Sequence, residues 1–291
     1  MLTIIGSEAI TVIVSSMGAE LHSIKNKVGL EYLWQADPKV WRRHAPVLFP
    51  FNGSPKNHSY TVNGNEYVLP TNHGFARDMD FTVIAASESA VTYCLSSTEE
   101  TMKQYPFAFE LYITYKVIDN NVHVSYTVVN KNNTDMYFYI GGHPAFNCPL
   151  DRAGEQPLRY EDYCIEYECD ETIIQIQSDG SSKKILNEEK RLSLSHELFN
   201  NDVIFKDKPM SSRITLKSDK SSFCASVAYD NSGCIAVWAP ASEDAQFVCL
   251  EPWSSIPTDK DNGFEALEDK PNASKLSAGS EYKFEYVITV Y

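Results

Sequence analysis

The sequence predicts an all-β protein built as a large antiparallel β-sandwich. Aromatic residues form 12% of the chain and cluster with valine, isoleucine and threonine, which favour strands. Turn-forming residues interrupt these segments about every ten residues, a spacing typical of sandwiches and barrels. Helical periodicity is scarce, and strands do not alternate with helices as in α/β proteins. We therefore expect few and short helices.

The first half of the chain has the clearest strand pattern. Residues 8–15 (EAITVIVS) alternate between apolar and polar, and a turn leads from them into 20–25 (ELHSIK). Residues 81–97 read as two strands joined by a Ser-Glu-Ser turn. Segments 109–118 and 122–130 flank an Asp-Asn-Asn sequence, which is typical of a hairpin.

The remaining segments are shorter or more polar. We expect strands at 135–141 and 281–290 and short helical turns at 99–104 and 193–200. The polar stretches are interpreted as loops, at 178–190 and 258–280. Because no linker interrupts the strand pattern and no repeat recurs, we expect one domain spanning 1–291.

Charge and hydropathy narrow the choice of partners. The formal net charge of −14 argues against binding to nucleic acid or to an anionic membrane surface. No apolar run approaches the roughly 20 residues that span a bilayer. The N-terminus lacks the basic and apolar regions of a signal peptide. A homodimer is compatible with the apolar strands.

The seven cysteines are odd in number and contain no C-x-x-C pair. This pattern is poor for a disulfide framework and poor for a zinc site. We interpret them as reduced cysteines packed like small apolar side chains, which suggests a reducing, cytoplasmic setting.

Histidine and glutamate mark two candidate catalytic segments. In the first, a strand runs into two glycines, His143 and a proline, so the backbone can approach a ligand beside a group that exchanges protons near neutral pH. In the second, an apolar strand delivers Glu251 next to a proline and Trp253; partial desolvation would make this carboxylate a better base. The alternatives are a structural histidine in a tight turn and a surface glutamate paired with an arginine.

A third polar segment combines His73 with Arg77, and a Trp-Arg-Arg-His sequence upstream adds Arg42 and Arg43. Imidazole and guanidinium groups are donors suited to hydroxyl or phosphate oxygens. The alternative is a solvated basic turn. The chain has no H-E-x-x-H, no phosphate-binding glycine loop and no G-x-S-x-G sequence, so we expect neither metal catalysis nor a nucleotide cofactor.

Taken together, these segments resemble the aldose 1-epimerase (galactose mutarotase) family in its LacX-like bacterial branch. The resemblance covers nearly the whole chain. It is carried by W-R-R-H-A-P-V-L-F-P from position 41, N-H-G-F-A-R from 72, G-G-H-P-A-F-N from 141 and L-E-P-W from 250. It implies a large β-sandwich with a cleft for a small-molecule sugar.

The family's site residues then correspond to particular positions. The resemblance implies that His143 is the acid and Glu251 the base. It also implies that His73 and Arg43 contact the sugar, with Arg42 as the neighbouring alternative to Arg43. An aspartate that holds sugar hydroxyls corresponds to Asp202.

Two further residues are assigned from their chemistry. Trp253 could stack on a sugar ring, and Arg77 could bind a hydroxyl or a phosphate. The chain has a single histidine where the well-studied galactose mutarotases have a pair, which leaves the identity of the sugar open.

The expected reaction interconverts the α and β anomers of a hexose by acid/base opening and reclosure of the ring. We expect a raised pKa for Glu251 and a pKa close to the free value for His143, since the two groups exchange roles in the two directions. The alternatives are a hexose-phosphate mutarotase, a non-catalytic carbohydrate-binding or sugar-sensing protein, and a glycoside hydrolase that would use Glu251 with Asp202.

Overall fold

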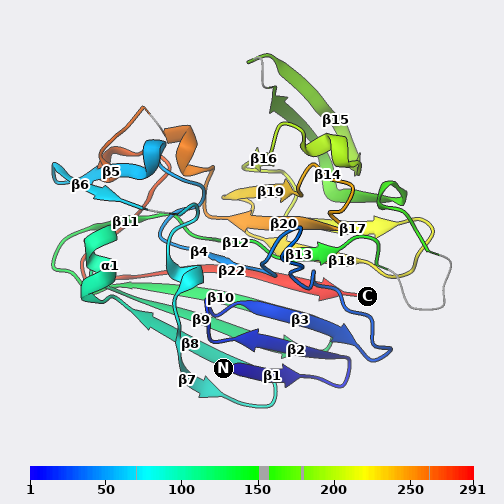
Figure 1. The fold of residues 1–291 in the computed structure, drawn as a ribbon, viewed down its shortest axis with the longest axis horizontal. Coiled ribbons are helices and arrows are strands. Elements are labelled where there is room, and N and C mark those ends of the chain that lie inside the picture. Colours follow the sequence, from blue (N-terminus) through cyan, green and yellow to red (C-terminus); the bar gives the residue numbers. More distant parts are fainter. Residues whose placement is uncertain (70, 151–156, 178–179, 262) are drawn as a thin grey trace.

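The computed structural model describes residues 1–69, 71–150, 157–177, 180–261 and 263–291 (Figure 1). Within these ranges strands dominate and antiparallel sheets make up the architecture. The expected all-β fold class is therefore confirmed.

The largest sheet has nine strands in the described part of the chain. Their order is β15-β14-β17-β18-β22-β10-β9-β8-β7, and every neighbouring pair is antiparallel. The strands are β7 (Thr82–Ala86), β8 (Ala90–Ser96), β9 (Phe109–Ile118), β10 (Asn121–Asn130), β14 (Tyr163–Ile176), β15 (Ser182–Ser193), β17 (Arg213–Ser218), β18 (Ala225–Tyr229) and β22 (Glu281–Val290). Along β9 and β10 every second residue is buried, so one face of this region packs into the core.

A second sheet carries the residues of interest. Its order is β16-β19-β20-β12-β4, with β13 also pairing with β20. The strands are β4 (Val47–Leu48), β12 (Gly141–Gly142), β13 (Ala145–Asn147), β16 (Ile204–Asp207), β19 (Cys234–Trp238) and β20 (Phe247–Trp253). All seven residues of β20 are buried. This central strand therefore delivers any polar side chain it carries into a desolvated environment.

Smaller elements surround the two sheets. A three-stranded sheet, β1 (Leu2–Gly6), β2 (Ile10–Ser15) and β3 (Leu21–Asn26), lies beside β8 and β9 (Figure 1). The hydroxyl of Tyr115 joins these layers by donating to the carbonyl of Ala19 at 2.8 Å. Two two-stranded sheets complete the strands: the hairpin of β5 (Ser59–Val62) with β6 (Asn65–Val68), and the long-range pair of β11 (Met136–Phe138) with β21 (Ser274–Leu276).

Helical structure in the described ranges is limited to one six-residue α-helix and short 3₁₀ turns. The α-helix α1 (Glu99–Gln104) coincides with the predicted turn at 99–104, and Thr98 caps it by accepting from the backbone N–H of Thr101 at 3.2 Å. The predicted helix at 193–200 is a shorter 3₁₀ turn, His196–Phe199. The other 3₁₀ turns are Lys56–His58, Ala76–Asp78, Tyr160–Asp162, Thr258–Asp261 and Leu267–Asp269.

Most predicted strands are confirmed with small shifts at their ends. The predicted strand at 135–141 is shorter, because regular pairing of β11 stops at Phe138. Position 262 of the loop predicted at 258–280 lies outside the described residues, and the remainder includes β21 and two 3₁₀ turns between irregular segments.

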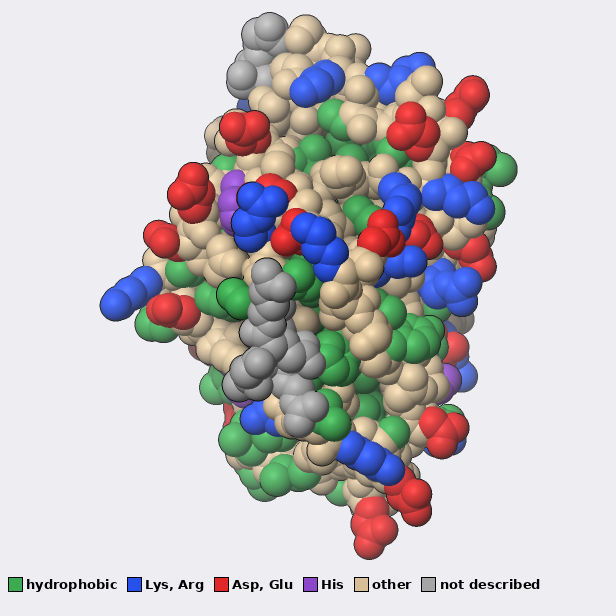
Figure 2. Space-filling view, turned by 90° about the vertical axis from the view of Figure 1, so that its right-hand side faces the viewer, with side chains coloured by type: hydrophobic (Ala, Val, Ile, Leu, Met, Phe, Trp, Pro, Cys, Tyr) green, Lys and Arg blue, Asp and Glu red, His purple; other side chains and the backbone are tan. Residues whose placement is uncertain are grey.

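The loop predicted at 178–190 is wrong. Positions 178–179 lie outside the described residues, and 182–190 belong to β15, a long strand at the edge of the nine-stranded sheet. Both faces of β15 are largely exposed, so it lacks the alternation that identifies half-buried strands. Its charges instead pair across the sheet, as Arg191 does with Glu166 at 3.2 Å. Figure 2 shows acidic and basic side chains interspersed on one face of the molecule.

Candidate active site

The carboxyl group of Glu251 projects from β20 and is 1% exposed. The neighbouring strand β12 leads directly to His143. At both positions of β12 only glycine fits, because a larger side chain would collide with its surroundings. A Cβ on Gly141 would lie 2.5 Å from the ring of Trp253, and one on Gly142 would lie 2.6 Å from the hydroxyl of Tyr286. Glycine thus lets the backbone pack closely enough to bring the imidazole to the carboxylate.

His143 and Glu251 form a buried pair. The imidazole Nε2 lies 3.2 Å from Oε2 of Glu251. Two indoles hold the imidazole in place: Trp41 stacks on it with ring centroids 5.2 Å apart, and Trp238 meets it edge-on at 5.7 Å. Within the described residues neither oxygen of Glu251 makes a close hydrogen bond, although the indole of Trp253 lies near enough to offset a little of the rise in pKa that burial causes in the carboxyl group. The imidazole is therefore held by aromatic contacts, whereas the carboxyl oxygens of Glu251 can still bond to a ligand.

Burial governs the protonation of this pair. Desolvation raises the pKa of Glu251 well above its ordinary value, as the sequence led us to expect. Desolvation also lowers the pKa of His143 to about 3, helped by the nearby cations Arg77 and Arg43. The expectation of a free-histidine pKa is therefore wrong, because the indoles exclude water from the imidazole. These opposite shifts favour the pair's proton on the carboxyl group rather than on the imidazole.

A second imidazole, that of His73, lies beside the pair with its ring centroid 5.6 Å from that of His143. Its Nδ1 accepts the backbone N–H of Gly53 at 2.9 Å. The hydrogen of a neutral His73 therefore lies on Nε2. Burial lowers the pKa of His73 well below its ordinary value, so this residue is a neutral donor.

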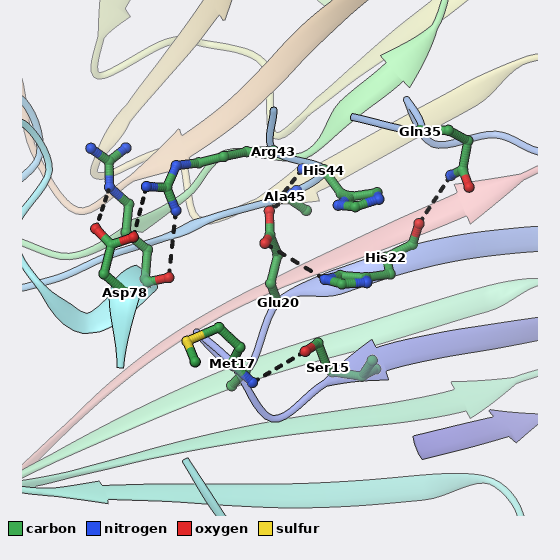
Figure 3. Close-up of polar contacts among 12 residues, drawn as sticks. Ser15, Met17, Glu20, His22, Gln35, Arg43, His44, Ala45 and Asp78 are labelled. Carbon is green, nitrogen blue, oxygen red and sulfur yellow. Dashed lines mark hydrogen bonds and ion pairs between the residues drawn. The ribbon is translucent and has the colours of Figure 1, made fainter. Parts of the chain in front are cut away.

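Two arginines share one aspartate at the edge of the site, and Figure 3 shows the contact of Arg43 with Asp78. Nη2 of Arg43 lies 2.8 Å from Oδ1 of Asp78, and Nε of Arg77 lies 3.9 Å from Oδ2. Burial lowers the pKa of Arg77 to about 10, so it stays cationic at neutral pH. Arg43 lines the cavity, whereas Arg42 is exposed and is absent from the lining. The two guanidinium groups leave a net positive charge beside the pair of His143 and Glu251.

Asp202 lies in the left-handed region at φ 68° and is tied to an indole. Its Oδ1 accepts from Nε1 of Trp238 at 3.0 Å. Since Trp238 also contacts His143, one side chain orients both the aspartate and the imidazole.

One cavity of about 590 Å³ connects these groups. The seven residues singled out from the sequence all line it: Arg43, His73, Arg77, His143, Asp202, Glu251 and Trp253. Its volume falls in the range of pockets that enclose small organic ligands.

Sequence reasoning missed part of this lining. Trp41 lay within a quoted motif but was given no role, and Trp238 was not considered. A tryptophan at the end of a strand is a weak sign of a sugar site, because such residues are more often part of the core. Gln175 reaches the cavity from β14, a strand that the sequence analysis did not identify.

Two groups of side chains in the described ranges have donor atoms within 4.8 Å of one another and so could ligate a metal ion: Glu20 with His22 and His44, and His143 with Cys249 and Glu251. In the first group the rings of His22 and His44 are stacked 4.1 Å apart and nearly parallel. Their in-plane lone pairs therefore do not converge on one point, which fits a metal ion poorly. Among the described helices, none is long and apolar enough to cross a membrane.

Comparison with known proteins gives a consistent family. The family model described as aldose 1-epimerase matches residues 1–261. The plasmid LacX protein of Lactococcus lactis subsp. lactis is 35% identical over 297 aligned positions, which cover 98% of this chain and 97% of that protein.

Two solved structures are similar over the full length of this chain. A galactose mutarotase related enzyme from Lactobacillus acidophilus is 34% identical with a TM-score of 0.89, covering 97% of that chain. A galactose mutarotase-like protein from Lactobacillus casei is 30% identical with a TM-score of 0.88, covering 100% of that chain.

Proposed function

The chain belongs to the aldose 1-epimerase family, and we propose that it interconverts the α and β anomers of a hexose, with Glu251 as base and His143 as acid. The observation that carries this proposal is the buried contact of 3.2 Å between these two side chains in the wall of a cavity of about 590 Å³.

The reaction needs two proton transfers at neighbouring atoms. The hydroxyl on C1 loses a proton while the ring oxygen gains one, so that the bond between C1 and the ring oxygen breaks. The open aldehyde then rotates about the C1–C2 bond and the ring recloses on the other face. Since both oxygens are bonded to the same carbon, one base and one acid in contact can serve them together.

The single proton of the pair is sufficient for this cycle. Moving it from Glu251 to His143 across their 3.2 Å contact is energetically uphill in this buried site, but it produces the carboxylate and the imidazolium that the reaction uses without exchange with solvent. The carboxylate then takes the C1 proton and the imidazolium protonates the ring oxygen. Reclosure of the ring reverses both transfers, so the pair ends with the proton it began with.

The neighbouring donors support charge on the sugar oxygens. The Nε2–H of neutral His73 is available to an oxygen of the ring, and the cationic Arg43 and Arg77 lower the energy of developing negative charge. Asp202 is suited to accept from a sugar hydroxyl, and the indole of Trp253 offers an apolar face for the ring. These side chains supply every group that the argued reaction uses.

A phosphorylated hexose is the second candidate substrate. Three cationic side chains line the cavity, namely Arg43, Arg77 and Lys260, and the two arginines share a single aspartate. Guanidinium groups with unused donors suit phosphate oxygens. This variant keeps the same pair of catalytic residues.

Optical rotation tests the proposal directly. Anomerically pure glucose, galactose and their 6-phosphates are added to the enzyme, and the approach to equilibrium is compared with the spontaneous rate. Faster equilibration of at least one sugar supports the proposal, and Glu251→Gln serves as the matched inactive control. If every sugar equilibrates at the spontaneous rate while calorimetry detects sugar binding, the protein is a non-catalytic sugar binder instead.

The same proposal treats residues 1–291 as one domain. It is supported by the large hydrophobic cluster whose members run from Ile5 to Val290.

A further inference from the structure

A buried carboxylate outside the pocket holds one of its walls. Glu20 lies in the turn between β2 and β3 and is 8% exposed. Its Oε1 accepts two backbone hydrogen bonds, from the N–H of His44 at 2.7 Å and from that of Ala45 at 3.0 Å (Figure 3). Both donors belong to a distant segment that precedes β4. Glu20 therefore fixes the backbone of that segment from outside the cavity.

The segment held by Glu20 carries two groups of the site. Trp41 stacks on the imidazole of His143 at 5.2 Å, and Arg43 pairs with Asp78 at 2.8 Å. Between Lys39 and His44 the structure assigns no strand or helix, so regular pairing does not hold this stretch. Its position depends on contacts such as the two that Glu20 accepts.

The same turn also contacts the second arginine segment. The backbone N–H of Gly18 donates to the carbonyl of Met79 at 2.7 Å. A Cβ at Gly18 would lie 2.7 Å from the carbonyl oxygen of Arg77, so this approach requires glycine. One turn thus braces both chain segments that bring arginines to the cavity.

The surroundings of Glu20 keep its carboxylate available for this task. Burial raises its pKa, but hydrogen bonding to His22 and to the backbone N–H groups of His44 and Ala45 outweighs burial, so its pKa lies below the ordinary value. His22 lies 3.7 Å from Oε2 and stacks on the ring of His44 at 4.1 Å. Hydrogen bonds to a charged acceptor are about twice as strong as those between neutral groups.

We propose that Glu20 is a positioning residue, which aligns Trp41 and Arg43 with the catalytic pair by holding the backbone of His44 and Ala45. This inference rests on the proposed function for its catalytic consequence. The geometric part, that Glu20 holds the segment, stands independently of which sugar is the substrate.

Three variants separate this role from general stability. Glu20→Ala removes the acceptor, whereas Glu20→Gln keeps an oxygen that can accept both N–H groups. Glu31→Ala is the matched control, because Oε1 of Glu31 also accepts two backbone N–H groups, from Ile24 and Leu33, in a segment that does not line the cavity. Each alanine variant loses a carboxylate oxygen that accepts two backbone N–H groups.

We expect Glu20→Ala to lower kcat/KM by at least about 10-fold, since small displacements of positioning groups have large effects on rate. Glu20→Gln and Glu31→Ala should stay within about threefold of the wild type. If Glu31→Ala loses as much as Glu20→Ala, the effect is one of general stability and the proposal is wrong. If Glu20→Gln is as impaired as Glu20→Ala, the two hydrogen bonds are not the cause.

Amide hydrogen exchange supplies a readout that needs no substrate. The amides of His44 and Ala45 should exchange at least about 10-fold faster in Glu20→Ala, and at nearly the wild-type rate in Glu20→Gln and Glu31→Ala. Unchanged exchange in Glu20→Ala would overturn the proposal even for an active enzyme. Conversely, a wild type that equilibrates no sugar contradicts the proposed function while the exchange experiment still decides the role of Glu20.

Discussion

Replacing His143 by asparagine should change how the stability of the protein depends on pH. In the folded protein burial holds the pKa of this imidazole at about 3, so it binds no proton between pH 4.5 and 7.5. In the unfolded chain a histidine has a pKa of about 6.5 and takes up a proton as the pH falls through that value. The unfolded state then binds more protons than the folded state, so acidification destabilises the wild type through this group.

The size of this destabilisation follows from the pH range between the pKa of His143 in the folded protein and its pKa in the unfolded chain. Stability changes by about 1.4 kcal/mol per pH unit where the two states differ by one proton. Between pH 6.5 and 4.5 this amounts to roughly 2–3 kcal/mol for His143. The contribution of the neutral imidazole to the stability of the folded protein is fully present above pH 6.5 and is lost as the pH falls toward 3. His143→Asn carries no titrating group at this position and lacks this dependence.

Urea unfolding at pH 4.5 and at pH 7.5 measures the effect. The difference in unfolding free energy between wild type and variant is taken at each pH, which cancels groups common to both proteins. The unfolding free energy of the variant minus that of the wild type should be larger at pH 4.5 than at pH 7.5, by roughly 2–3 kcal/mol. His58→Asn, at an exposed position, is the control for loss of an imidazole.

An equal difference at the two pH values would refute the reasoning. It would mean that the imidazole of His143 titrates with the same pKa in the folded and the unfolded protein, and the description of a neutral, buried imidazole beside Glu251 would be wrong.

Three further predictions concern the same region. Glu251→Gln should lower kcat by at least about 10²-fold in the optical-rotation assay while still unfolding cooperatively, and a near-normal rate would exclude Glu251 as the base. Trp238→Phe keeps a ring beside His143 but loses the N–H that binds Asp202. We therefore expect KM to rise about 10-fold while kcat stays within threefold of the wild type. An unchanged KM would contradict a role for this contact in sugar binding. Gly74→Ala should lower the free energy of unfolding, measured in urea, by at least about 2 kcal/mol. The reason is that Gly74 has φ +75° and that a Cβ there would overlap the carbonyl of Phe49. Unchanged stability would show that the backbone relaxes at no cost and would contradict this prediction.

The sequence predicted those parts of the fold in which local pattern and final environment agree. Strands β9 and β10 bury every second residue, so their alternation is visible in the sequence. Strand β15 has solvent on both sides and depends on pairing with β14, which no short window reveals. Its polar residues therefore resembled a loop.

The candidate site shows a similar division. Motifs and chemistry pointed to His143 and Glu251, and both line the cavity. Their contact depends on the pairing of β12 with β20, which brings distant segments together. The low pKa of His143 depends on burial between two indoles from other parts of the chain. Glu20 was not singled out because a glutamate at a turn is usually a solvated residue.

A crystal structure with a bound substrate sugar tests the central claim most directly, because it locates the reacting carbon relative to the pair. The account predicts the C1 hydroxyl within hydrogen-bond distance of the Glu251 carboxyl group and the ring oxygen within the same distance of Nε2 of His143, about 2.6–3.2 Å in each case. A sugar whose anomeric carbon lies beyond hydrogen-bond distance of both groups would contradict it.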